Sequence, residues 1–314
     1  MMCQPAKSPS TGLDRPYTRR NWLLAAAAIL RGAVPASARD FESRPQGQRT
    51  CLYEVHAAIT FLGATILTRK RAGWGCASVQ SSPGGLLLEF AAGSDPARAA
   101  GLNRVGLIEE RLRFETGGAV ETSYFGLMTA SPEESLSDAR KALRDSSSAQ
   151  TYIAAEGRAK GGRITNATHR IQFGEPFTWS GRDRLLAFAK AAAASRRYLV
   201  RDNESESQPG VKAGALSALL AAFESREPKA RAAFTYNSGK YELTTERVSP
   251  HDGTQSADCC VNGRIRNLAT GRKTAFRVWI GPHGSSPVPV RIEYQAKPYL
   301  RLVFEQVNPR ADQS

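Results

Sequence analysis

The stretch that decides the fold reads Phe276-Arg-Val-Trp-Ile280, then Pro289-Val-Arg-Ile-Glu-Tyr294, then Leu300-Arg-Leu-Val-Phe-Glu305. Apolar and charged side chains alternate in each segment. Because side chains two positions apart in a strand point to the same face, each segment has one apolar and one polar face. We therefore predict a mainly β protein: a curved antiparallel sheet, or half-barrel-like meander, covered on one side by a few helices.

Upstream of these segments, short strand-like stretches are again separated by glycine-containing turns. This pattern favours a meander over alternating strands and helices. One hairpin is expected around the turn Asn237-Ser238-Gly239. Three helices are expected to interrupt the strands. The first two begin at Ser131 and near Ser180, where capping residues precede apolar side chains at helical spacing. The third begins near Val211 and is indicated by helical spacing alone.

The first 38 residues resemble an export signal. Arg19 and Arg20 precede an apolar run from Trp22 to Leu30, and Ala36-Ser-Ala38 offers the small-x-small pattern of a signal-peptidase site. The arginine pair also suits the twin-arginine route. Arg31 shortens the apolar run, and the alternative is a short N-terminal helix of a cytosolic protein. We expect an exported protein of the periplasm or cell envelope.

The sequence suggests five segments. They are an export signal (1–38), a flexible lead-in (39–50), a β-rich part with two helices (51–200), a polar linker (201–210), and a C-terminal helix with antiparallel strands (211–314). No apolar run after the leader is long enough to span a membrane as a helix.

The closing strands resemble a family of exported bacterial proteins, the domain of unknown function 3108. The resemblance rests on the Val278-Trp279 pair, on Pro289-Val-Arg-Ile-Glu-Tyr294 and on the leucine-rich last strand, and it extends from about Leu216 to Phe304. It implies an envelope-associated protein built on a curved antiparallel sheet, akin to lipoprotein-carrier half-barrels. The resemblance implies no activity.

The charge is strongly basic. The leader holds five basic residues and one acidic residue, so the formal charge of +14 falls to +10 after cleavage. The basic residues are spread along the chain, which is typical of a solvated surface but also suits anionic lipid headgroups or acidic polysaccharides. Nucleic acid is an unfavourable partner, because no recognition motif accompanies the charge.

Four cysteines follow the leader: Cys51, Cys76, Cys259 and Cys260. An oxidising compartment permits three pairings, of which Cys51–Cys76 is preferred, since the adjacent pair would point to opposite strand faces. The alternative is that all four are small buried side chains. Their spacing matches no zinc site.

No residue set adds up to a reaction, and we predict no catalytic residue, cofactor or metal. The paired carboxylates Glu109 and Glu110 and the loop histidine His283 are the places where a hydrolase site would have to form.

The leading hypothesis is a non-enzymatic envelope protein that binds a lipid-like ligand, or another envelope component, in a concavity of the sheet. The residues expected to line that concavity are Phe276, Val278, Ile280, Val290, Ile292 and Tyr294. The simplest alternative is that these side chains only form the core. Two rival functions stay open: an interaction module that docks to anionic partners through a basic face and, less favoured, an unrecognised hydrolase.

Overall fold

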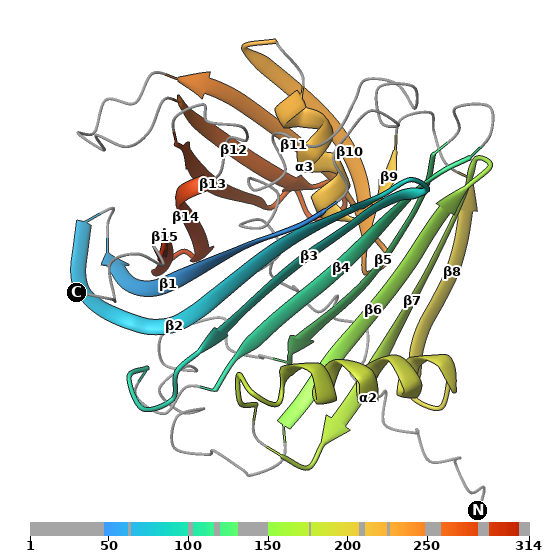
Figure 1. The fold of residues 1–314 in the computed structure, drawn as a ribbon, viewed down its shortest axis with the longest axis horizontal. Coiled ribbons are helices and arrows are strands. Elements are labelled where there is room, and N and C mark those ends of the chain that lie inside the picture. The colour runs from blue at the N-terminus through green and yellow to red at the C-terminus, as the bar shows by residue number, and fades with distance from the viewer. Residues whose placement is uncertain are drawn as a thin grey trace, which may run out of the picture.

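The computed structural model describes residues 47–61, 64–99, 103–115, 120–130, 150–175, 177–206, 211–224, 227–248, 259–281 and 289–307. Within these residues the protein is mainly β, as predicted: strands of one continuous sheet and two helices (Figure 1).

The N-terminal half of the sheet is an antiparallel meander in which each strand pairs with the next along the chain. Its strands are β1 (Gly47–Phe61), β2 (Ala64–Ser82), β3 (Gly85–Ser94), β4 (Val105–Phe114), β5 (Val120–Thr129), β6 (Gln150–Lys160), β7 (Arg163–Phe173) and β8 (Leu199–Glu206).

The C-terminal half is a second meander, again antiparallel except for a short parallel pair between its first two strands. Its strands are β9 (Lys212–Ala213), β10 (Lys229–Tyr236), β11 (Gly239–Val248), β12 (Cys259–Asn267), β13 (Lys273–Ile280), β14 (Pro289–Lys297) and β15 (Leu300–Gln306). The two meanders join where β15 pairs antiparallel with β1, so the first and last strands lie side by side in the middle of the sheet.

The order of the strands forces the sheet to curl. Glu206 ends β8 at one edge and Lys212 begins β9 at the other edge, yet only five residues separate them. A chain of that length spans at most roughly 20 Å. The two edges must therefore lie close together. In the structure the backbone N–H of Ala213 donates to the side-chain oxygen of Thr122 on β5, at 3.0 Å.

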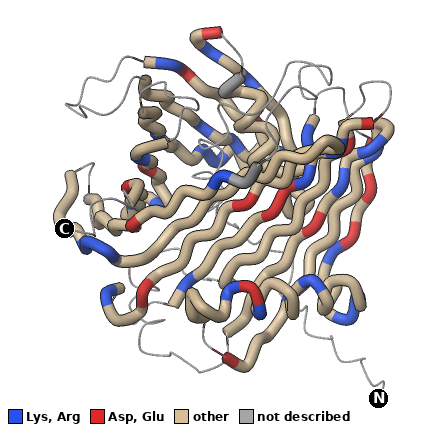
Figure 2. The backbone as a smooth tube through the Cα atoms, viewed as in Figure 1, with Lys and Arg blue, Asp and Glu red and all other residues tan. Residues whose placement is uncertain are grey.

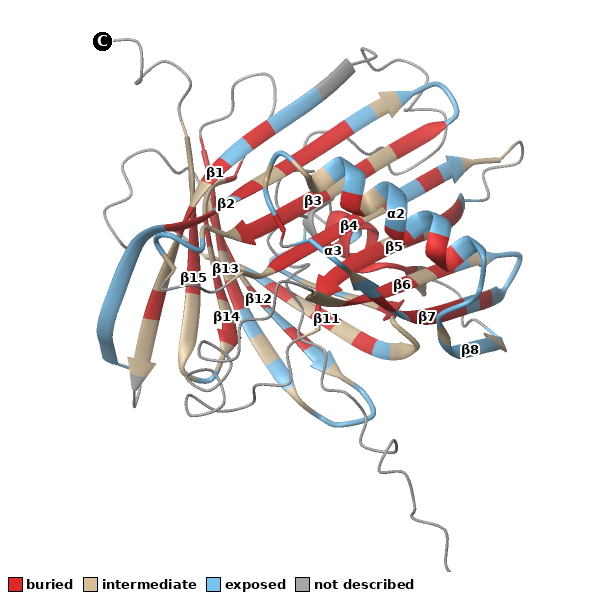
Figure 3. Cartoon of the chain, turned by 90° about the horizontal axis from the view of Figure 1, so that it is seen from below, coloured by how far each residue is buried: buried red, intermediate tan, exposed pale blue. Residues whose placement is uncertain are grey.

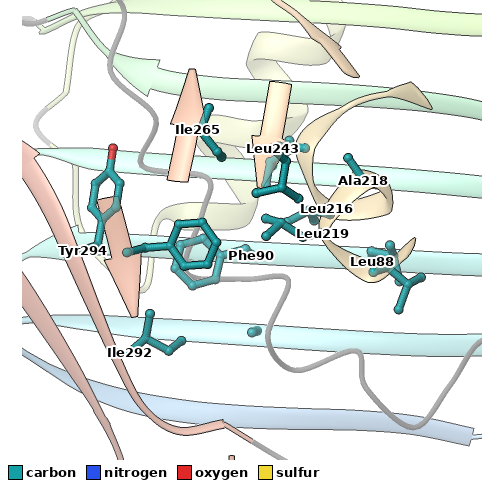
Figure 4. Close-up of a cluster of buried hydrophobic side chains, with 14 of the residues drawn as sticks. Leu88, Phe90, Leu216, Ala218, Leu219, Leu243, Ile265, Ile292 and Tyr294 are labelled. Atoms are coloured by element: carbon teal, nitrogen blue, oxygen red, sulfur yellow. The ribbon is translucent and has the colours of Figure 1, made fainter. Parts of the chain in front are cut away.

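Helix α3 (Ala215–Glu224) lies inside this curl, against β9, β10, β11 and β4. Every residue from Ala215 to Leu220 is buried. A helix that is apolar on all sides is stable only where protein surrounds it, which explains its interior position. Figure 4 shows Leu216 and Leu219 of α3 in one cluster with Leu88, Leu243 and Ile265 of the surrounding strands.

Helix α2 (Arg182–Ala194) covers the opposite, outer face of the N-terminal half, over β5 and β7. Its buried side chains include Leu185 and Ala189, which pack into a second hydrophobic cluster with Leu127, Tyr152 and Ile171. The N-terminal half thus has three layers: α2, the sheet, and the α3 layer (Figure 3).

Two of the three predicted helices are confirmed. The helix expected near Ser180 is α2, although its N-terminus has Gly181 at the capping position and no side-chain cap. The helix expected near Val211 is α3, preceded by the short strand β9. The helix expected from Ser131 lies outside the described residues. Among the described residues, neither helix is long and apolar enough to cross a bilayer.

Two predicted irregular segments are partly strands. Gly47–Thr50 of the expected lead-in begins β1, and residues 201–206 of the expected linker belong to the edge strand β8. An edge strand pairs on one side only and faces water, so its sequence can be as polar as a loop. Residues 39–46 and 207–210 lie outside the described residues.

Candidate functional site

The side chains expected to line a ligand groove are core residues. Phe276, Val278, Ile280, Ile292 and Tyr294 are each at most 4% exposed, and all five belong to the cluster around α3. Val290 is half-buried. Figure 4 shows Ile292 and Tyr294 beside Phe90 of the opposite half. The structure therefore follows the simpler alternative for these residues, because α3 fills the space that the curled sheet encloses.

The paired carboxylates of β4 point to opposite faces, as alternation requires. Glu109 faces outward and forms an ion pair with Lys190 of α2. Glu110 faces inward and is 1% exposed. These two groups do not converge on one cleft, so the geometry gives no acid–base pair for hydrolysis.

Glu110 instead caps the inner helix. The backbone N–H of Leu216 donates to Oε1 at 2.6 Å, and that of Ser217 donates to Oε2 at 2.7 Å. A carboxylate at a helix N-terminus satisfies free N–H groups and interacts favourably with the helix dipole. Burial nevertheless raises the pKa of the Glu110 carboxyl from 4.5 to about 7, against the opposing effect of those hydrogen bonds.

The preferred disulfide does not form in this structure. Cys51 and Cys76 are both free. Cys51 lies opposite Ala77 in the sheet register and faces the core, whereas Cys76 lies opposite Leu52 and faces outward. Directly opposed residues share a face of the sheet, and Cys76 is one position away from the partner of Cys51, so these two thiols are on opposite sides of the sheet. Cys259 and Cys260 form no disulfide in this structure either.

Several sequence candidates lie outside the described residues. They are the export-signal residues Arg19, Arg20, Ala36 and Ala38, and the loop histidine His283. Within the described segments, no three His, Cys, Asp or Glu side chains gather as a metal site.

A hollow of about 740 Å³ lies over β10–β15. Along each strand, most of the residues that line the hollow alternate with residues of the core around α3. The hollow therefore lies on the face of the sheet that is turned away from α3. One cross-strand row holds Lys229, Glu246, Asn262, Arg277 and Glu293.

A second row of the same hollow runs beside the first. Arg231, Thr244 and Arg264 follow one another across β10–β12, and Arg301 closes the row on β15. The backbone at Phe276 and Tyr294, between outward-facing neighbours, borders the hollow as well.

Basic groups outnumber acidic groups in this hollow. Two carboxylates line it, and both are neutralised: Glu246 pairs with Lys229 at 3.2 Å, and Glu293 pairs with Arg291 at 2.7 Å and with Arg301 at 3.6 Å. The five basic residues that line it are Lys229, Arg231, Arg264, Arg277 and Arg301.

Arg231 and Arg264 are exposed and have no ion-pair partner among the described residues. Figure 2 shows basic segments gathered on the strands of this half. A guanidinium group offers paired N–H donors that match carboxylate, phosphate or sulfate oxygens. The arrangement can therefore hold anionic groups, and two arginines are available for them.

Arg277, which lines the hollow, lies over an aromatic side chain next to it. Trp279 is 3% exposed and lies between two guanidinium groups, those of Arg277 at 5.5 Å and Arg291 at 5.3 Å from the ring centroid. Arg277 also donates from Nε to Oδ1 of Asn262, at 2.9 Å. Cations stacked on an indole face lose freedom, so this part of the hollow is preorganised.

Sequence reasoning missed this hollow because its arginines are far apart along the chain. The alternation of each strand showed that these arginines face away from the core. Only the register of β10–β15 shows that they face one another.

A smaller hollow of about 300 Å³ lies on the outer face of β3–β6. Its carboxylates are paired with basic side chains: Glu121 with Arg158 at 2.6 Å, and Glu109 with Lys190. Arg111 and Arg113 line this hollow as well, so its smaller volume, and not its charge, makes it the weaker candidate for binding.

The comparisons with known proteins add a fold likeness only. No protein-family model matches the chain, and no curated protein matches it by sequence. Among solved structures it is similar to a beta-barrel-like protein of domain of unknown function DUF1849 from Brucella abortus. The match covers 84% of this chain and 97% of that chain, with a TM-score of 0.37 and 9% identity.

Proposed function

We propose that this protein is an exported, non-enzymatic interaction module of the cell envelope that binds an anionic partner in the hollow of β10–β15. The observation that carries the proposal is the hollow itself: five basic side chains and two neutralised carboxylates around about 740 Å³. The partner is defined by its chemistry, a cluster of carboxylate, phosphate or sulfate groups.

Carriage of a lipid-like ligand inside the curved sheet is less well supported. The side chains that would have lined such a site are buried against α3, and the interior belongs to the core.

Export is the second part of the proposal, and it is supported by the leader and by the resemblance of the closing strands to an exported family. N-terminal sequencing of the protein isolated from the envelope fraction is expected to start at Arg39. Recovery of a chain that starts at Met1 from the cytosol would contradict it.

The binding proposal is tested by titrating the protein with fluorescently labelled dextran sulfate and with neutral dextran of the same size. We expect binding to dextran sulfate alone, weakening at high salt because exposed charges are screened beyond about 10 Å at 0.1 M ionic strength. The variant Arg231→Gln/Arg264→Gln is expected to raise the Kd about tenfold, equivalent to about 1.4 kcal/mol.

The matched control is Arg163→Gln/Arg201→Gln, which removes the same charge from exposed positions on β7 and β8. It is expected to leave the Kd nearly unchanged. Equal losses of affinity for dextran sulfate in both variants would show that net charge alone attracts the polyanion. That result would contradict binding in the hollow.

A further inference from the structure

The far part of β2 forms an exposed edge of the sheet, where the neighbouring part of β1 pairs with β15 on its other side. All eight residues Ala64–Arg71 of β2 are exposed. This stretch pairs with β1 alone, since β3 pairs with β2 only from Gly73 onward. Figure 3 shows it as a pale-blue stretch at the left edge of the molecule. We call Ala57–Phe61 and Ala64–Arg71 the ribbon.

The ribbon is held in a fixed direction at its base. A bulge sets three residues of β2 opposite His56 of β1, and Arg71 has a φ of 53° there. The backbone N–H of Arg71 donates to Nδ1 of His56 at 2.9 Å, and its side chain pairs with Glu54 at 3.0 Å. On the other side, Arg301 donates to the Thr65 hydroxyl at 3.0 Å. The ribbon therefore has a defined orientation.

Apolar side chains are exposed near the tip of the ribbon. Ile66 is 64% exposed and Leu67 is 47% exposed, more than most large apolar side chains of the described residues. Leu67 lies opposite Ile59 on the neighbouring strand. Neighbouring exposed apolar side chains at a sheet edge are a candidate contact surface.

Basic side chains follow directly behind the apolar tip. Arg69 and Lys70 are exposed and have no ion-pair partner among the described residues, and β2 contains no acidic residue between Ala64 and Ser82. Figure 2 shows the basic stretch where the ribbon bends.

We propose that the ribbon docks onto an anionic lipid bilayer, with Ile66 and Leu67 entering the boundary between headgroups and acyl chains. An apolar edge next to cationic side chains matches such a boundary, because the tip gains from burial and the cations gain from the anionic headgroups. A protein partner would have to offer an apolar surface surrounded by acidic side chains. An anionic bilayer offers apolar acyl chains and anionic headgroups over its whole surface. The inference rests on the ribbon and is independent of the hollow of β10–β15.

The test is co-sedimentation of the full chain with vesicles of phosphatidylcholine containing one-third phosphatidylglycerol, and with vesicles of phosphatidylcholine alone. We expect binding to the anionic vesicles only. Ile66→Ser/Leu67→Ser is expected to weaken it at least tenfold, because the apolar surface of the tip is lost. Arg69→Gln/Lys70→Gln is expected to weaken it roughly thirtyfold and to reduce its dependence on salt.

Two matched controls separate the ribbon from general effects. Val200→Ser/Leu268→Ser replaces apolar residues that are 59% and 47% exposed elsewhere, and is expected to bind like the wild type. Arg163→Gln/Arg201→Gln removes the same charge from exposed positions on β7 and β8, and is expected to keep most of the binding. Circular dichroism checks that each variant is folded.

Three results would overturn the inference. One is equal binding to both kinds of vesicle, and another is unchanged binding of the two ribbon variants. The third is a self-associated wild type that the ribbon variants make monomeric in sedimentation velocity, which would identify a second copy as the occupant. If only the variant Arg231→Gln/Arg264→Gln lost vesicle binding, the ribbon would not be the membrane-docking element. The proposed function of the hollow would still stand.

Discussion

At the scale of single residues, the contact between Glu110 and the start of α3 leaves little room for a change of side chain. Gly214 precedes the helix with a φ of +104°, and a Cβ atom there would lie 2.3 Å from the carboxyl carbon of Glu110. Glycine is needed for both reasons, conformation and space. The carboxyl group can then reach the backbone N–H groups of α3 without contact with water.

This contact predicts a pH-dependent stability. The pKa of Glu110 is 4.5 in the unfolded chain and about 7 in the folded protein, so the folded state binds the proton more tightly. The stabilisation from this group is complete below pH 4.5 and is lost as the pH rises through 7. The total change is about 3 kcal/mol in the free energy of unfolding.

Urea unfolding of wild type and Glu110→Gln between pH 5 and pH 8 measures this effect. The wild type is expected to lose stability as the pH rises, and the difference between the two proteins should change by most of this amount, roughly 2 to 3 kcal/mol, over that range. Glu109→Gln, on the outer face of the same strand, is the control and should keep the wild-type slope. Parallel curves for wild type and Glu110→Gln would refute the assignment.

At the scale of elements, the β10–β11 hairpin ties the two halves of the sheet together. The backbone N–H of Asn237 in its turn donates to the hydroxyl of Tyr124 on β5 at 2.6 Å, and the Thr168 hydroxyl donates to Oδ1 of Asn237 at 2.6 Å. The rings of Tyr124 and Tyr236 lie 5.0 Å apart. These contacts hold the β10–β11 turn in place against the N-terminal half of the sheet.

The second turn residue is poorly suited to its conformation. Asn237 and Ser238 have φ values of 50° and 61°, the left-handed pair of a type I′ turn, in which glycine is preferred at the second position. The Ser238 hydroxyl is also buried without a hydrogen-bond partner among the described residues. We expect Ser238→Gly to stabilise the protein by about 1 kcal/mol.

Thermal and urea unfolding of Ser238→Gly test this prediction. Ser205→Gly in β8 is the control, because a glycine within a strand gains nothing from left-handed freedom and should be neutral or destabilising. A less stable Ser238→Gly protein would mean that the serine makes a favourable contact.

At the scale of the whole molecule, one sheet runs through both meanders, and α3 packs against both. The N-terminal half contributes Leu88 and Phe90 to the core around α3, and the C-terminal half contributes Leu243 and Ile265. Neither half can bury its apolar face alone. The two halves should therefore unfold together.

Tryptophan fluorescence can follow the halves separately. In Trp279→Phe it reports on Trp74 and Trp179 of the N-terminal half, and in Trp74→Phe/Trp179→Phe it reports on Trp279, with Trp22 common to both. In each variant we expect the urea midpoint by fluorescence to equal the midpoint by far-ultraviolet circular dichroism. A fluorescence midpoint that departs from the circular-dichroism midpoint in one variant would show that the halves unfold in separate steps.

The sequence predicted the features that depend only on residues close together along the chain. Alternation identified the strands and the core side of Phe276, Val278 and Ile280, and helical spacing identified α2 and α3. The local pattern did not predict β8, because its polar residues lie at a solvated sheet edge and resemble a loop. It also misjudged Cys51 and Cys76, because the face of each thiol depends on the register of two strands.

The sequence by itself determined the mainly β class, the inner and outer faces of the closing strands and the apolar character of α3. The tertiary structure alone decided that β1 pairs with β15, that the sheet curls around α3, that Glu110 caps that helix, and that arginines from β10 to β15 share one hollow. The reason is physical: the pleat and the helical turn are set within a few residues, whereas register, closure and surface charge patterns arise from contacts between segments that are tens to hundreds of residues apart.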